Sequence, residues 1–393
     1  MKQYDIVAVI ALFVLCFLQG CDAPPDWSPK GGMFAFLNVE GDKHNYQCKI
    51  YLYDTSNNSR SVIAVSELLL GVPAWSPNGE RIAFLQVLPG ANKGETGGYR
   101  LSIMIYDVKG KTIAEAASVF KVNQQMVPDF RKAVQEGTLV VACLRLVQYP
   151  LLWHPDGDNV VYSLGFGSRS PSDDIQMINV ATGKTIGLAH GEPWGWSKDG
   201  KAFAYIAHRL DTKEEYLSLV DDKGLKDRVL VKSRDLTSPL SASMYVINDV
   251  RYGWPRWSES GKELLFAGAD RLAFVDIASG RIRTPFEDFV VCSPVWVPNK
   301  NVIVYFKIIE QRERPYEGNE CCLVVKDLKN ANDNIIYKYI EKNRYVGYGM
   351  SLSPDGKWLT FVHPRDAGKM PRKETSIILL SIEGNMERVI MFP

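Results

Sequence analysis

The segment WSPNGERIAF (Trp75–Phe84) is one of seven copies of a ten-residue pattern that recur along the chain without gaps. The others are WSPKGGMFAF from Trp27, WHPDGDNVVY from Trp153, WSKDGKAFAY from Trp196, WSESGKELLF from Trp257, WVPNKNVIVY from Trp296 and LSPDGKWLTF from Leu352. Trp opens six of the seven copies, Gly is fifth in six, and an aromatic residue closes all seven. Self-similarity of this kind indicates a repeated structural unit.

The pattern reads as a strand, a tight turn and a second strand. Pro presets φ for a turn, Asp hydrogen-bonds nearby backbone amides, and Gly tolerates positive φ. The residues after the turn alternate in polarity, as Ile82 and Phe84 do, which is typical of a strand. We therefore expect one strand to end at the Trp and the next to end at the aromatic residue.

A second signal follows each copy, namely an apolar run that usually ends in Asp, such as IMIYD ending at Asp107. A short turn and a further strand come next, so each unit holds four strands, named A to D in chain order. Four-stranded antiparallel units that repeat every ~40–50 residues are typical of propeller blades. The sequence thus predicts an all-β fold, a seven-bladed β-propeller of four-stranded antiparallel blades. The longest interval between copies, before Trp153, is interpreted as an insertion, because residues 119–150 lack a turn motif.

At these residues the chain resembles the TolB-like β-propeller repeat family over about residues 26 to 393. The resemblance is specific for the fold and weak for function. The chain has no room for the separate N-terminal α/β domain of TolB, so it resembles TolB in its repeats without being a TolB orthologue. Propeller enzymes of the prolyl oligopeptidase type carry an added hydrolase domain, and the GxSxG elbow of such a domain is missing.

The N-terminus resembles a bacterial lipoprotein signal peptide. The apolar run Ile6 to Leu18 is shorter than the ~20 residues of a membrane-spanning helix. It ends in Leu18-Gln19-Gly20-Cys21, which resembles a lipobox with an uncommon Gln19. We expect a signal peptide over 1–20, lipidation of Cys21 and a propeller over 21–393, held in the cell envelope by lipid. An ordinary cleaved signal peptide or an uncleaved anchor is the alternative.

Composition excludes some partners. The chain carries 46 Lys+Arg and 45 Asp+Glu, a net charge of +1, so no global field favours nucleic acid. Five cysteines remain beyond the signal and Cys21, without a CxxC pair, and we interpret them as buried strand thiols. A vicinal disulfide between Cys321 and Cys322 is the alternative. No cofactor is expected, and we expect a monomer.

Connection lengths place a candidate binding surface at one edge of the blades. A–B and C–D turns share one edge and are short, whereas the long insertions fall in the B–C and D–A connections at the other edge. The expected B–C insertions are Leu88–Tyr99, Gly165–Asp173, Glu310–Glu320 and Pro364–Lys373, and the expected D–A insertions are Phe120–Pro150 and Ser233–Tyr252. Function usually resides in long loops on a rigid scaffold, and Arg and aromatic residues anchor interfaces. The candidate partner-binding residues are Arg251, Tyr252, Trp254, Arg312, Arg314 and Tyr316. A mainly basic loop with Arg365, Lys369, Arg372 and Lys373 adds to them.

No catalytic or metal constellation is predicted. His154 takes the place of the turn Ser and is expected to serve in the turn, and Asp276 and Asp327 are expected to be turn caps. The leading hypothesis is a non-enzymatic module that binds an envelope protein or glycan. The alternative is a metal-assisted polysaccharide lyase, similar to the propeller-shaped oligogalacturonate lyases. Its metal ligands would be His190, expected just after strand D of the third repeat, and His208, expected beyond strand B of the fourth. A purely structural role in an envelope assembly is a third option.

Closure of the ring is predicted without a shared strand. Only Asp22 to Asp26 precede Trp27, so the first strand A must be very short. Residues 387–392 read as strand D of the seventh blade, which leaves no strand to complete the first. We expect the first and seventh blades to meet by side-chain packing alone.

Overall fold

The structure is a computed structural model, and it describes fourteen stretches of the chain. They are residues 25–41, 46–89, 99–122, 151–163, 174–209, 214–232, 256–268, 271–286, 294–310, 319–330, 332–341, 350–364, 375–384 and 387–391. The chain divides into two compact units, Met1–His190 and Gly191–Pro393. All regular structure in the described stretches is β, and none of them contains a helix long and apolar enough to cross a membrane.

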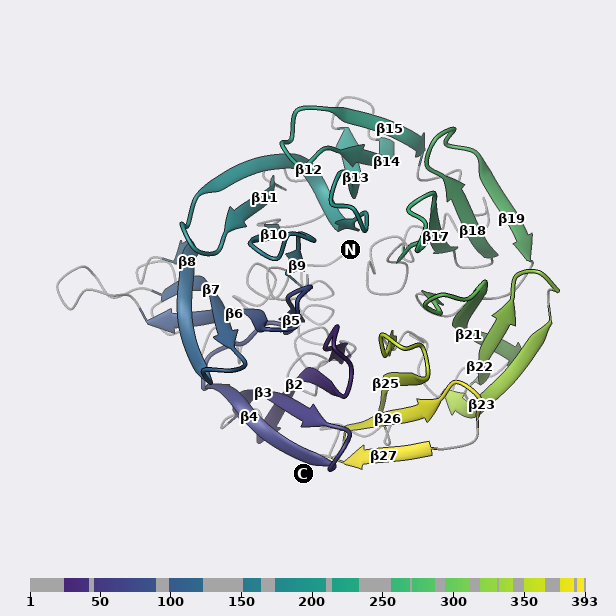
Figure 1. Cartoon of the computed structure of the whole chain (residues 1–393), viewed down its shortest axis with the longest axis horizontal. Helices are drawn as coiled ribbons and strands as arrows, with labels where there is room; N and C mark the ends of the chain where they lie inside the picture. Colours follow the sequence, from purple (N-terminus) through teal and green to yellow (C-terminus); the bar gives the residue numbers. More distant parts are fainter. Residues whose placement is uncertain are drawn as a thin grey trace, which may run out of the picture. The chain divides into compact units, whose positions relative to one another are not determined.

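The first unit contains two four-stranded antiparallel sheets and the beginning of a third (Figure 1). The first sheet is β1 (Asp26–Trp27), β2 (Met33–Gly41), β3 (Tyr46–Asp54) and β4 (Ser59–Ser66). The second is β5 (Ala74–Trp75), β6 (Arg81–Pro89), β7 (Tyr99–Asp107) and β8 (Thr112–Val122). Next come β9 (Leu152–Trp153), β10 (Asn159–Ser163), β11 (Asp174–Asn179) and the first half of β12 (Thr185–Trp196).

The second unit begins with the other half of β12, which pairs with β13 (Phe203–Arg209). That sheet continues with β14 (Glu214–Val220) and β15 (Asp227–Lys232). Three four-stranded sheets follow in strand order. The first is β16 (Arg256–Trp257), β17 (Glu263–Gly268), β18 (Arg271–Asp276) and β19 (Ile282–Phe286). The second is β20 (Val295–Trp296), β21 (Val302–Glu310), β22 (Asn319–Asp327) and β23 (Asp333–Glu341). The third is β24 (Met350–Leu352), β25 (Trp358–Pro364), β26 (Thr375–Ser381) and β27 (Glu387–Met391).

The repeat motif places the strand ends as predicted. Every strand A ends at the first motif residue, as β5 does at Trp75 and β24 at Leu352. Strand C ends at the predicted capping residue in six of the seven cases, and β14 ends one residue before Asp221. The first strand A has only two residues, as expected, and β27 pairs with β26 of its own sheet.

Two predicted strand limits are wrong. Strand B does not end at the aromatic residue, as β6 shows by running past Phe84 to Pro89. The strand is longer because β7 pairs with it along its whole length. The fourth strand of the third set does not end before His190, because β12 continues directly as the first strand of the next set, up to Trp196.

Three of the motif Trp residues join consecutive sheets within the two units. Trp153 donates its indole N–H to the carbonyl of Ala74, the residue before Trp75, over 3.0 Å. Trp257 and Trp296 make the equivalent bonds to the carbonyls of Gly195 and Arg256, at 3.1 and 3.2 Å. In these three copies the motif Trp therefore contacts the neighbouring sheet as well as ending its own strand A.

Trp153→Phe is expected to lower the free energy of unfolding by about 1 kcal/mol more than Trp75→Phe does. Both Trp side chains are buried, but the indole nitrogen of Trp75 has no hydrogen-bond partner within the described stretches, so only Trp153 loses a bond. Urea unfolding of both variants measures the difference. Equal losses would mean that the indole bond contributes nothing.

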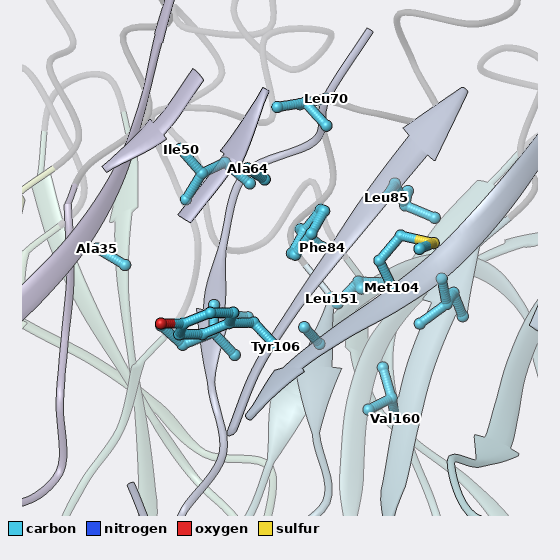
Figure 2. Close-up of a cluster of buried hydrophobic side chains, with 14 of the residues drawn as sticks. Ala35, Ile50, Ala64, Leu70, Phe84, Leu85, Met104, Tyr106, Leu151 and Val160 are labelled. Atoms are coloured by element: carbon cyan, nitrogen blue, oxygen red, sulfur yellow. The ribbon is translucent and has the colours of Figure 1, made fainter. Parts of the chain in front are cut away.

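The core of the first unit lies between its sheets (Figure 2). Phe84 and Leu85 of β6 and Met104 and Tyr106 of β7 are buried there. Leu70, from the connection between β4 and β5, packs in the same cluster and is 1% exposed. The amide of the next residue, Gly71, donates to the carbonyl of Leu85, so this connection is fixed to β6. The rigid part of the scaffold therefore reaches the edge where the long connections start.

Candidate functional site

The two edges of the sheets differ in the length of their connections. The A–B and C–D connections, such as 28–32 and 108–111, are short throughout both units. The long connections are all B–C or D–A, and this edge is called the loop-bearing edge below. The longest of these connections are 90–98, 123–151, 164–173, 233–255 and 365–374, and 287–294, 311–318 and 342–349 are the next in length. The strands reach further into several of the predicted insertions than expected, since Leu88 and Tyr99 both lie in strands.

The predicted partner-binding residues lie outside the described stretches. This holds for Arg251, Tyr252 and Trp254 before β16, and for Arg312, Arg314 and Tyr316 between β21 and β22. It also holds for the basic loop 365–373 and for Cys21. These residues remain predictions, and the described strands show only that their segments start from the loop-bearing edge.

A charged cluster stands at the loop-bearing end of β2 and β3. Lys49 donates to one carboxylate oxygen of Glu40 over 2.5 Å, and the Tyr51 hydroxyl donates to the other. Asn38 donates to the same oxygen as Tyr51, at 3.4 Å. Strand alternation brings them together, because Asn38 and Glu40 share a face of β2 and the register sets Lys49 opposite Asn38. A carboxylate with three donors is a fixed acceptor rather than a free base.

The pKa values of Glu40 and Tyr51 are shifted in opposite directions. Burial acts to raise the pKa of Glu40, but hydrogen bonds from Lys49 and Tyr51 outweigh it and the pKa lies below the usual value. Burial and the bond to Glu40 raise the pKa of Tyr51 to about 12. Glu40 is therefore ionised and Tyr51 protonated at neutral pH. The cluster holds the strand ends together, and neither the Glu40 carboxyl nor the Tyr51 hydroxyl is poised for proton transfer near pH 7.

Glu40→Gln is expected to destabilise the protein by about 1 kcal/mol at pH 7 and hardly at all in acid. A carboxyl whose pKa is lowered by folding stabilises the fold above its unfolded pKa. That contribution disappears as the pH falls through the folded pKa, here below 4.5. Urea unfolding of both proteins from pH 7 down to pH 3 measures it. A gap between them that stays constant down to the lowest pH would contradict the assignment.

A second ion pair lies on the second sheet, near its loop-bearing edge. Arg100 donates to both carboxylate oxygens of Glu115, at 3.3 and 3.0 Å, and also to the carbonyl of Pro89, at the end of β6. The buried hydroxyl of Ser102 donates to Glu115 over 2.7 Å. Arg100 thereby ties strands B, C and D of this sheet together, directly below the connection 90–98.

At the opposite edge, polar groups of the A–B turns form hydrogen bonds within their own turn. Ser197 donates its hydroxyl to Asp199 and accepts the amide of Ala202, and the motif Ser residues 76 and 353 repeat both bonds. His154 takes this place in the third set, where its Nδ1 accepts the amide of Asp156. The prediction that His154 is a turn residue is confirmed.

The predicted turn caps of the C–D turns are confirmed as well. Asp276 accepts the amide and hydroxyl of Ser279, and these bonds lower the pKa of its carboxyl. Asp327 accepts the amide of Lys329. The carboxylates of Asp276 and Asp327 are thus engaged with their own turns.

The two candidate metal ligands are both in strands. His190 lies in β12 opposite Asp174, and His208 lies within β13, which continues to Arg209 because β14 pairs with it up to Glu214. The sequence placed each of them just beyond a strand, which is wrong. Among the described residues, no group of three or more His, Cys, Asp and Glu side chains could hold a metal ion.

Three of the cysteines are buried and free, as the strand-thiol interpretation predicts. Cys48 lies in β3, and Cys321 and Cys322 are adjacent in β22. Cys321 packs between β20–β23 and β24–β27, whereas Cys322 packs toward β16–β19. Successive strand residues point to opposite faces, so these two thiols cannot form a vicinal disulfide in this strand. Cys143 and Cys292 lie outside the described stretches.

No protein-family profile matches the sequence, and no curated protein matches it either. Solved structures do match. An oligogalacturonate lyase from Vibrio parahaemolyticus is 10% identical with a TM-score of 0.55, covering 95% of this chain and 89% of the lyase. The β-propeller domain of the Trilobed protease from Pyrococcus furiosus is 11% identical with a TM-score of 0.53, covering 93% and 96%. TolB from Acinetobacter baumannii matches more loosely, at 14% identity and a TM-score of 0.46, covering 92% and 80%.

At identities of 10–11% the likenesses to the lyase and to the Trilobed protease domain show the fold and not the activity. Both matches agree with the repeated four-stranded sheets. The chain is an all-β protein with the fold of a β-propeller.

Proposed function

We propose that the protein is a non-enzymatic binding module of the bacterial cell envelope, anchored by lipid at Cys21, which binds a protein or glycan partner at its loop-bearing edge. The observation that carries the proposal is the difference between the two edges. Short, self-capped turns occupy one edge, while every long connection starts from the other. Rigid strands that present long loops on one side are the usual design of a binding surface.

The proposed propeller has seven blades. Seven motif copies support this number, as does the strand order in which β12 ends one four-stranded set and begins the next. The pairing of β27 with β26 supports a ring that closes without a shared strand. The Trilobed protease domain is itself described as having an open velcro topology.

Affinity capture from solubilised membranes tests the binding function. The full protein should recover one partner, protein or glycan, in a stoichiometric amount. A variant with the connection 311–318 replaced by a short Gly-Ser turn should lose that partner, while a variant with the short connection 108–111 replaced should keep it. Loss in both variants, or no stoichiometric partner with the full protein, would contradict the proposal.

Cys21→Ser is expected to abolish lipid attachment and to leave the protein with its signal uncleaved or released from the membrane. The lipobox-like residues 18–21 motivate this prediction. Intact mass spectrometry of the membrane fraction measures the acyl groups on Cys21. An unmodified Cys21 at a mature N-terminus would overturn the anchor.

The alternative is a metal-assisted polysaccharide lyase. Its support is the likeness to oligogalacturonate lyases, one of them in complex with manganese, at a TM-score of 0.54 and 12% identity. Metal analysis of the purified protein separates the two functions. A stoichiometric divalent metal that is lost in His190→Ala or His208→Ala would favour the lyase.

A further inference from the structure

We propose that, in the anchored protein, the loop-bearing edge of the first sheet lies in direct contact with the membrane surface. The inference rests on the proposed lipid anchor at Cys21 and deepens the proposed function, because it assigns the lipid surface as a neighbour of the binding edge. Two features carry it, namely the direction of β1 and the length of chain between Cys21 and the first fixed residue.

The direction of β1 sets the side from which the chain enters. β1 is antiparallel to β2, with Asp26 opposite Ala35 and Trp27 opposite Phe34. It runs toward the short connection 28–32, at the turn edge. The chain that precedes β1 therefore leads toward the loop-bearing edge.

The distance available to the anchor is short. Pro25 is buried, and the chain from Cys21 to Pro25 spans at most about 14 Å, whatever path it takes. Beyond Ala35, β2 continues from Phe36 to Gly41, which is about 20 Å of strand. Cys21 therefore cannot extend past the level at which β2 ends.

A lipid on Cys21 must still place its acyl chains in the bilayer. Because the residue that carries it stays at or below the strand ends, the bilayer surface has to come to that level. The described side chains named at that level are polar or charged, since Gln47 and Glu67 are exposed and Glu40 and Lys49 form an ion pair, so contact with the polar bilayer surface buries none of them in an apolar environment. The C–D turn 55–58 is at the other end of β3, about 30 Å away.

Energy transfer to labelled lipids tests the orientation. A fluorophore is attached through an introduced non-natural residue at Gln47 or at Ser56, both exposed and on the same sheet. The mature acylated protein is reconstituted in phosphatidylethanolamine–phosphatidylglycerol vesicles that contain acceptor lipids. We expect several-fold more transfer from position 47 than from position 56. Inserting a flexible Gly-Ser linker of about 20 residues after Cys21, which spans ~25 Å on average, should largely remove the difference.

Each outcome decides a different point. Equal transfer from the two positions, or more from position 56, would overturn the inference while leaving the anchor intact. The Ser28 amide, directly after β1, donates to the carbonyl of Met33 in β2. Faster hydrogen exchange of this amide in the anchored protein than in a released form would also overturn the inference, because β1 would then have detached to lengthen the tether. Absence of acyl groups on Cys21 would overturn the proposed anchor, and the inference with it.

Discussion

Gly191→Ala is expected to lower the free energy of unfolding by about 4 kcal/mol or more. Gly191 begins the second half of β12, with a φ of 144° that side chains with a Cβ rarely adopt. A Cβ built there would lie 1.9 Å from the carbonyl oxygen of Ile206 and 2.8 Å from its carbon. Both are backbone atoms of the paired strand β13, so the contact is relieved only by separating the two strands.

Two other glycines of β12 provide matched controls for this prediction. Gly195 has a φ of 149° but open space for a Cβ, so Gly195→Ala adds backbone strain alone, worth about 1–3 kcal/mol. Gly187 has open space and no positive φ, so Gly187→Ala should be nearly neutral. Urea unfolding of the three variants should rank them in this order. A Gly191→Ala variant no less stable than Gly195→Ala would show that the strands separate at little cost.

These glycines illustrate how far the sequence predicts the fold. The ends of strand A follow from the motif because Pro, Asp and Gly fix a turn through local backbone preferences, and all seven are placed as predicted. The length of strand B depends on its partner across the sheet, which no local pattern contains. The segment Gly191–Trp196 contains two glycines, and only the tertiary contact with Ile206 distinguishes them.

The residues of the candidate site also differ in whether the sequence predicts their roles. His154 and Asp276 were predicted as turn residues because their bonds are local. The cluster around Glu40 was missed, since it joins residues of two strands whose register had to be known first. Alternation alone could have suggested it, because Asn38 and Glu40 are polar residues two apart in an otherwise apolar strand. The bonds of Trp153, Trp257 and Trp296 to the preceding sheet depend on the packing of two sheets and had no signal in the sequence.

Asp333→Asn is expected to destabilise the protein by about 2–3 kcal/mol, because it leaves a buried cation without its carboxylate. The side chain of Lys326 is 6% exposed, and its ammonium group lies 2.5 Å from Asp333. The same ammonium group lies 4.4 Å from the ring centroid of Phe286, on the preceding sheet. Lys307 contacts the second oxygen of Asp333 at 3.3 Å, so one carboxylate serves two cations.

Removing the cation of Lys326 instead should lower the free energy of unfolding much less. Lys326→Met keeps most of the side-chain volume and the contact with Phe286, and removes the need to desolvate a charge, so a loss of about 1 kcal/mol or less is expected. In the Lys326→Met background, Asp333→Asn should then cost only a fraction of what it costs in the parent protein, because no buried cation remains unpaired. Urea unfolding of the parent, the two single variants and the double variant gives this coupling. Additive losses would mean that water reaches Lys326 and that the pair acts as a surface ion pair, worth about 0–1 kcal/mol.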